Sequence, residues 1–261
     1  MNAQAEGGAS RCLSPDDPAP VIVHNPGARA GLLLVCDHAG RLIPQGLGDL
    51  GLPPAELVRH IAWDIGAAGL ARQLAERLGA ELILQAYSRL VVDCNRDPGE
   101  AAAAPTFSDE TRVLGNEGLS PDALAARIAE IHAPYHACIA AALAAKGPGA
   151  VLVSVHSFTP EMQGFRRPWH VGVLHSHDSP ASKRLLALLQ SEPDLVVGDN
   201  QPYAMDGIDY TVPRHAKANG LDYLEIEVRQ DLIAQPVGQE AMAVRLAPLI
   251  AEAVGSPPAP A

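Results

Sequence analysis

The sequence lacks the long apolar runs of a membrane protein. No run approaches the roughly 20 residues needed to cross a bilayer. Residues 1–20, MNAQAEGGASRCLSPDDPAP, also lack the basic-then-apolar pattern of a secretory signal. These two absences predict a protein that has no membrane partner and works in the cytoplasm.

Basic clusters, aromatic residues and paired cysteines are scarce as well. The net charge is −11, only 4% of the residues are aromatic, and no run of Lys or Arg occurs, so phosphate backbones are repelled and a nucleic-acid partner is not expected. The four cysteines form no CxxC pair, and Cys36 and Cys94 lie in apolar strand patterns, which favours buried thiols over a disulfide framework. If an acidic protein of this kind binds an anionic metabolite, it must do so through a local group of arginines.

What the sequence does have is enough apolar residues, 48% of 261, to bury a sizeable core. Apolar runs that end in polar residues alternate with helical patterns, and this alternation predicts an α/β fold with one domain, in which helices cover both faces of a mixed, mainly parallel sheet. We expect a loose tail over 1–28, the domain over 29–255, a second tail over 256–261 and a long ordered loop over 97–120. The expected strands are 31–38, two short ones around Tyr87-Ser88 within 81–96, 150–158, 170–175, 195–200 and 223–230. The expected helices are 53–80, 121–147 with a kink at Pro134, 179–193 and 236–254.

Two histidines at strand ends are candidate metal ligands. His38 and His156 each follow an apolar run, and the carboxyl ends of strands form the ligand crevice of open α/β sheets. Asp64 is the candidate third ligand, because a carboxylate in the otherwise apolar stretch HIAWDIG requires a partner. His60, four residues earlier on the same expected helix, competes as a ligand or supports one. Asp64 can also be a surface charge or pair with an arginine, and either histidine alone can be structural.

A second histidine pair, His132 and His136, has the i, i+4 spacing that can chelate a metal on a helix. No glutamate follows His132 as it does in HExxH, and Pro134 lies between the two histidines. A surface or packing role is therefore the favoured interpretation.

Two glutamates alternate with apolar residues in the run LEIEVR. Their period of two places Glu225 and Glu227 on one face of a strand, and Arg229 on the same face. Buried carboxylates require partners or a chemical role. Glu227 is the candidate general base, and an ion pair with Arg229 is the structural alternative.

Two groups of arginines are candidate sites for substrate carboxylates. Asn95 and Arg96 end the run VVDCNR, and the fork of a guanidinium matches a carboxylate. Arg166 and Arg167 form a second cationic group, which suits a dicarboxylate substrate, although either group can also be solvated. Arg229 is a further candidate for substrate binding.

Seven motifs in their order along the chain resemble the N-formylglutamate amidohydrolase family over about residues 30–235. The motifs are HAGRLIP (38–44), HIAWDIG (60–66), SRLVVDCNR (88–96), SVHSFTP (154–160), RPWH (167–170), GDNQPY (198–203) and IEVRQDLI (226–233). That family is similar to zinc carboxypeptidases. The resemblance therefore implies their phosphorylase/hydrolase-like fold. The resemblance implies a zinc ligand at His156 of H-S-F, a base at Glu227 of E-x-R and a carboxylate-binding pair at Asn95-Arg96. Carboxypeptidases take two ligands from H-x-x-E, but Arg41 stands three residues after His38, so the resemblance leaves the carboxylate ligand to Asp64.

The resemblance implies a zinc-dependent amidohydrolase that acts on a small anionic N-acyl amino acid, first of all N-formyl-L-glutamate, and the family name suggests a place in histidine breakdown. In this hypothesis His38, Asp64 and His156 hold Zn²⁺, Glu227 is the base for an activated water, and Arg89 or Arg167 stabilises the oxyanion. Formimidoyl, carbamoyl or other acyl substrates, or non-catalytic binding of an acidic metabolite, are the alternatives. A serine nucleophile is disfavoured, since no GxSxG elbow occurs.

Overall fold

A seven-stranded sheet forms the centre of the computed structural model, which describes residues 11–176, 178–205, 207 and 209–255. The strands run across the sheet in the order β1-β3-β2-β6-β11-β9-β10. Neighbours β3, β2, β6 and β11 are parallel, β9 is antiparallel to β11, and β1 is antiparallel to β3. The single α/β domain with its mixed, mainly parallel sheet confirms the fold class predicted from the sequence.

The strands and helices have the following bounds. The sheet contains β1 (Val21–His24), β2 (Leu32–Cys36), β3 (Glu81–Gln85), β6 (Val151–Phe158), β9 (Val171–Leu174), β10 (Val197–Asp199) and β11 (Asp222–Arg229). Two hairpins are β4 (Phe107–Ser108) with β5 (Thr111–Arg112), and β7 (Glu161–Met162) with β8 (Phe165–Arg166). The helices are α1 (Ala67–Leu78), α2 (Pro121–Arg127), α3 (Ala133–Lys146), α4 (Pro180–Gln190), α5 (Thr211–His215), α6 (Gln230–Ile233) and α7 (Pro236–Ala253).

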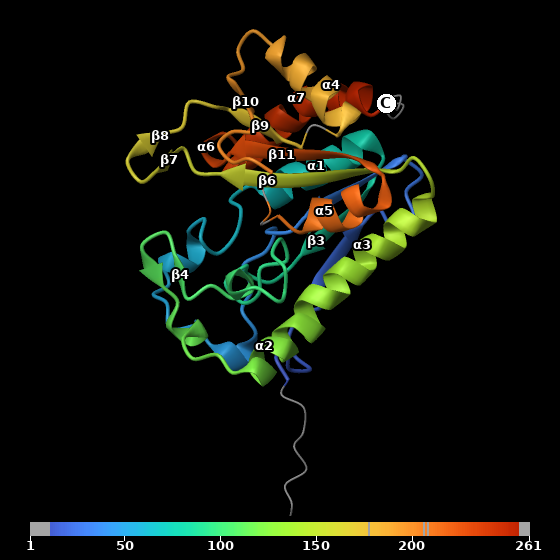
Figure 1. The fold of residues 1–261 in the computed structure, drawn as a ribbon. Coiled ribbons are helices and arrows are strands. Elements are labelled where there is room, and N and C mark those ends of the chain that lie inside the picture. The colour runs from blue at the N-terminus through green and yellow to red at the C-terminus, as the bar shows by residue number, and fades with distance from the viewer. Residues whose placement is uncertain (1–10, 177, 206, 208, 256–261) are drawn as a thin grey trace, which may run out of the picture.

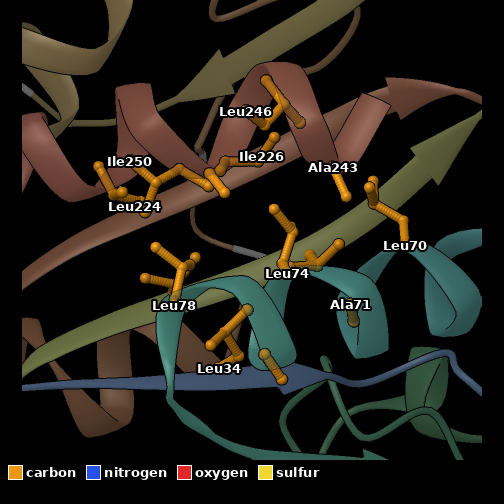
Figure 2. Packing of buried hydrophobic residues seen from close by; sticks show 14 of the residues in the cluster. Leu34, Leu70, Ala71, Leu74, Leu78, Leu224, Ile226, Ala243, Leu246 and Ile250 are labelled. Atoms are coloured by element: carbon orange, nitrogen blue, oxygen red, sulfur yellow. The ribbon is translucent and has the colours of Figure 1, made fainter. Parts of the chain in front are cut away.

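Helices cover both faces of the sheet (Figure 1). On one face α1, α4 and α7 pack on the apolar side of the strands, and Figure 2 shows Leu74 and Leu78 of α1 in one cluster with Leu224 of β11 and Leu246 of α7. On the other face Tyr135, Ile139 and Leu143 of α3 lie in a second core. Strand β11 divides its side chains between the two faces: Leu224, Ile226 and Val228 enter the first core, which leaves Glu225 and Glu227 on the opposite side.

The expected helix over 53–80 begins later than its pattern suggested. Residues 53–66 form short turns, and α1 begins at Ala67 after Gly66, whose φ of 83° is left-handed. A Cβ at Gly66 would lie 2.1 Å from the carbonyl oxygen of Ile233, so only glycine fits at this position. The correction matters for the site, because His60 and Asp64 do not share a helical face; Asp64 lies in a turn whose backbone N–H donates to the carbonyl of His38 at 2.9 Å.

The second strand expected within 81–96 does not form. Strand β3 ends at Gln85, only an isolated bridge joins Tyr87 to Leu42, and residues up to 96 follow turns. The apolar run of Leu90, Val91 and Val92 is buried in a small core of its own beneath the long loop. Apolar character alone therefore did not distinguish a buried turn segment from a strand.

Two smaller expectations are also corrected. Residues 21–24, placed in the loose tail 1–28, form β1 and pair with β3, whereas 1–10 and 256–261 lie outside the described residues. Pro134 is in the first turn of α3, directly after a wide π-helical turn at Ile128–His132. A proline in a first turn needs no N–H partner, and the wide turn takes the place of the expected kink. No helix in the described part of the chain is long and apolar enough to span a membrane.

Candidate metal centre and active site

The carboxyl ends of three parallel strands meet at one cavity of about 300 Å³. His38 follows β2, His156 lies near the end of β6, and Glu227 lies near the end of β11. Asp64 reaches the same cavity from the turn before α1. These four side chains are distant in sequence and are brought together because parallel strands end at one edge of the sheet.

His38, Asp64 and His156 form a compact set of metal-ligating groups. Their ligand atoms all lie within 4.8 Å of one another, and each side chain is buried. Asp64 Oδ2 lies 2.9 Å from His156 Nδ1 and 3.4 Å from His38 Nδ1. The buried His38 Nδ1 has no hydrogen-bond partner among the described residues. Two imidazole nitrogens and one carboxylate oxygen are a donor set that fits a divalent metal such as Zn²⁺.

Each of the two histidines has a carboxylate close to its Nε2 atom. Asp93 Oδ1 accepts from His38 Nε2 at 2.7 Å, and Asp37 Oδ2 lies 3.2 Å from His156 Nε2. Each carboxylate fixes the proton on Nε2 and so leaves Nδ1 free to bind a metal, which is the usual support of metal-bound histidines. Sequence reasoning gave neither aspartate a role. Their positions within VCDH and VVDCNR, directly beside the site residues, were the available signal.

Removing the support of His156 is expected to weaken metal binding. In Asp37→Asn the side chain can present its N–H₂ to His156 Nε2, which disfavours the tautomer that binds metal through Nδ1. We expect metal affinity to fall by roughly 10–100-fold, as for other residues of this kind. Competition with a zinc chelator of known affinity measures the change, and an affinity equal to that of the wild type would contradict this role of Asp37.

In the absence of metal the cluster is held together by charge. Burial acts to lower the pKa of His156, but hydrogen bonds to Asp37 and Asp64 raise it well above its usual value. Burial likewise acts to raise the pKa of Asp64, and the two histidines lower it strongly. A proton on the imidazoles and a metal ion therefore compete for the same cluster, so metal binding is expected to weaken as the pH falls.

Glu227 and Glu225 face the cavity from one side of β11. Each is buried, and each has an Oε2 atom without a hydrogen-bond partner among the described residues. Burial raises the pKa of Glu227 from 4.5 to about 7, and burial raises that of Glu225 well above its usual value. The alternative pairing of Glu227 with Arg229 is not formed, since Arg229 bonds to Asp231 instead. A carboxyl group whose pKa is near neutrality suits a general base that later returns its proton.

The raised pKa of Glu227 predicts how stability changes with pH. Between pH 4.5 and about 7 the folded metal-free protein holds a proton on Glu227 that the unfolded chain releases, so the contribution of Glu227 to the free energy of unfolding falls as the pH rises through this window. Glu227→Gln removes this loss, and we expect it to stabilise the metal-free protein by up to roughly 3 kcal/mol at pH 8 and by little near pH 4.5. Urea unfolding of both proteins in chelator checks this; an equal difference at both pH values would contradict it.

Arg89, Asn95 and Arg96 also line the cavity. Arg89 donates to Asp93 Oδ2 at 2.8 Å and lies 3.6 Å from Asp64, so it adds positive charge beside the cluster. Arg96 bonds to the carbonyl of Asn95 and lies 3.6 Å from Asp209. Of the two arginine groups predicted from the sequence, the structure thus places the pair Asn95 and Arg96 at the cavity.

The second group lies elsewhere. Arg166 is exposed on β8, and Arg167 is buried between the rings of Phe158 and Tyr203 and donates to Thr159. Neither arginine, nor Arg229, is among the residues that line the cavity. Phe158, Thr159 and Tyr203 do line it, so Arg167 contacts the site indirectly, through these residues.

His60 lines the cavity but stands apart from the three-residue cluster. Its Nε2 lies 3.3 Å from Asp109 of the hairpin loop between β4 and β5. Arg59 forms a 2.6 Å ion pair with the same aspartate and so anchors that loop. These residues belong to the rim of the cavity rather than to the metal centre.

Comparisons with known proteins agree with this geometry. The family model of N-formylglutamate amidohydrolase matches residues 30–234. A crystal structure of a gene product from Agrobacterium tumefaciens is 38% identical, with a TM-score of 0.90, and the match covers 94% of this chain and 98% of that one. An N-formylglutamate amidohydrolase from Ralstonia eutropha JMP134 is 18% identical with a TM-score of 0.67 over 91% of this chain and 98% of its own, a likeness of fold. A search of curated proteins finds no match.

Proposed function

Because the chain belongs to the N-formylglutamate amidohydrolase family, we propose that it is a metal-dependent enzyme that removes the acyl group from a small N-acyl amino acid. One observation carries the proposal: a buried set of His38, Asp64 and His156 opens on the same cavity as the carboxyl of Glu227. A metal site beside a candidate base is the arrangement that metal-assisted hydrolysis of an amide requires.

The proposed mechanism gives each residue of the cavity a task. His38, Asp64 and His156 hold the metal, which when bound polarises the amide carbonyl and lowers the pKa of a water. Glu227 accepts a proton from the attacking water and later donates it to the leaving nitrogen, so that the acid and the free amino acid are released. Arg89, beside Asp64, adds positive charge where the oxyanion develops.

N-formyl-L-glutamate is the proposed substrate, and Zn²⁺ is the proposed metal. The cavity of about 300 Å³ suits a small molecule, and the presence of Asn95 and Arg96 in its lining supports a substrate that carries a carboxylate. Substrates with a formimidoyl, carbamoyl or longer acyl group would be cleaved by the same residues. They differ from the formyl compound in the space that this group needs.

A substrate panel tests the proposal. The zinc-loaded protein is incubated with N-formyl-, N-formimidoyl-, N-carbamoyl- and N-acetyl-L-glutamate, and the release of free glutamate is measured. We expect the highest kcat/KM with the formyl compound. Faster turnover of another member would replace the substrate and keep the reaction class, whereas no turnover of any member, with metal bound, would point to a non-catalytic binder.

A further inference from the structure

Two histidines that the proposed mechanism does not use contact the backbone of the segment Cys94–Arg96. His136 Nε2 lies 2.9 Å from the carbonyl oxygen of Cys94, and His132 Nε2 lies 3.1 Å from that of Arg96. Both imidazoles are buried. The segment between these two contacts carries Asn95 and Arg96 into the cavity.

The contacts fix the proton on each ring. A carbonyl oxygen only accepts, so Nε2 of both His132 and His136 must donate. Burial lowers the pKa of His136 to about 3, so the ring is neutral and its Nδ1 is an acceptor, to which His215 Nε2 donates at 2.8 Å. His215 thus donates a hydrogen bond to His136, and His136 donates one to the carbonyl of Cys94. His136 uses both nitrogens in this way, which excludes the metal chelation that its i, i+4 spacing with His132 suggested.

The segment depends on such contacts because it lies outside the sheet. Residues 88–96 follow turns instead of a ladder, so their buried polar groups must find partners elsewhere. The side chain of Asn95 is held as well: its Oδ1 accepts from the backbone N–H groups of Tyr210 and Thr211 at 3.0 and 2.9 Å. The segment is therefore held on one side by α3 and on the other by the start of α5.

The π-helical turn places the two imidazoles. Residues Ile128–His132 form this wide turn directly before α3, and the rings of His132 and His136 lie with their centroids 4.4 Å apart. Wide turns of this kind are frequent at functional sites. Here the turn directs both rings to one short stretch of backbone.

We infer that His132 and His136 are positioning residues for substrate binding: their hydrogen bonds to the carbonyls of Arg96 and Cys94 hold Asn95 and Arg96 in place for the substrate carboxylate. The inference rests on the proposed function for its kinetic consequence. Neither histidine lines the cavity, so the hydrolytic step at Glu227 and the metal is not affected directly.

A matched pair of variants separates the hydrogen bond from ring packing. His132→Phe keeps a ring beside His136 and Tyr210 but has no donor, whereas His132→Gln loses the ring and keeps an N–H near the position of Nε2. For H132F we expect KM to rise about tenfold, the effect of one lost hydrogen bond, with kcat within about twofold and bound metal unchanged. For H132Q we expect KM near that of the wild type.

Hydrogen exchange gives a second readout that does not need turnover. Peptides that cover 93–98 and 209–212 are expected to exchange faster in H132F than in the wild type or H132Q. If the wild type hydrolyses no N-acyl amino acid but this exchange pattern appears, the proposed function fails and the positioning role stands.

Other outcomes would overturn the inference. An unchanged KM with unchanged exchange in H132F would remove the role, and equal damage in H132F and H132Q would reduce it to ring packing. If H132F does not fold, His136→Phe, which removes the donor to the carbonyl of Cys94, carries the same test, with the same rise in KM and exchange expected and their absence contradicting the inference.

Discussion

Replacing Glu227 by Gln is expected to lower kcat by about 10²–10⁴-fold, the usual contribution of a general base, while the metal stays bound. Glutamine has nearly the same shape but cannot accept a proton from water or return one to the leaving amine. Glu227 is not among the three clustered ligands, so the metal site itself is preserved. Steady-state kinetics with the metal content measured on the same samples check the result.

Glu225→Gln is the matched control for this prediction. It is the same change, on the same face of β11 and in the same cavity, two residues earlier. We expect it to keep the metal and to lose far less activity than E227Q. Full activity in E227Q, or equal losses in the two variants, would remove Glu227 as the base.

Replacing Asp64 by Asn is expected to abolish activity at ordinary zinc concentrations through loss of the metal. Asp64 Oδ2 lies within 3.4 Å of the Nδ1 atoms of both histidines, and its negative charge offsets the charge of a bound cation. The loss of affinity is expected to exceed the roughly 10–100-fold predicted for Asp37→Asn, because a ligand atom is removed rather than its support. Metal analysis after dialysis, followed by assays at rising zinc, measures this loss.

Asp109→Asn controls for the charge of the cavity. Asp109 lines the cavity too, but it bonds to Arg59 at the rim. We expect this variant to retain zinc in full. Retention of stoichiometric metal in Asp64→Asn would remove Asp64 from the ligand set.

The parts of the fold predicted correctly from the sequence are those with a strong periodic pattern. The alternation of Glu225 and Glu227 with Leu224, Ile226 and Val228 placed the two glutamates on one face of β11, and the structure shows that division. The polar residues at the ends of β2 and β6 predicted a shared crevice for the same reason: one edge of a parallel sheet collects the ends of its strands.

The parts predicted wrongly are those in which long-range contacts decide the local structure. An apolar pattern continues through 53–66, but Gly66 must approach the backbone of Ile233, and the helix begins only after it. Residues 88–96 resemble a strand, yet their backbone carbonyls contact the imidazoles of His136 in α3 and His132 in the turn before it, which no local pattern shows. The supporting roles of Asp37 and Asp93 likewise depend on which ring nitrogen each contacts in three dimensions.

The release of formate from N-formyl-L-glutamate, measured with zinc supplied and with zinc removed by a chelator, decides whether the protein is a metal-dependent deformylase. We expect release that stops in chelator and returns when zinc is added back, with one metal bound per chain, as the one cluster among the described residues implies. Release at the same rate with and without bound metal would contradict it.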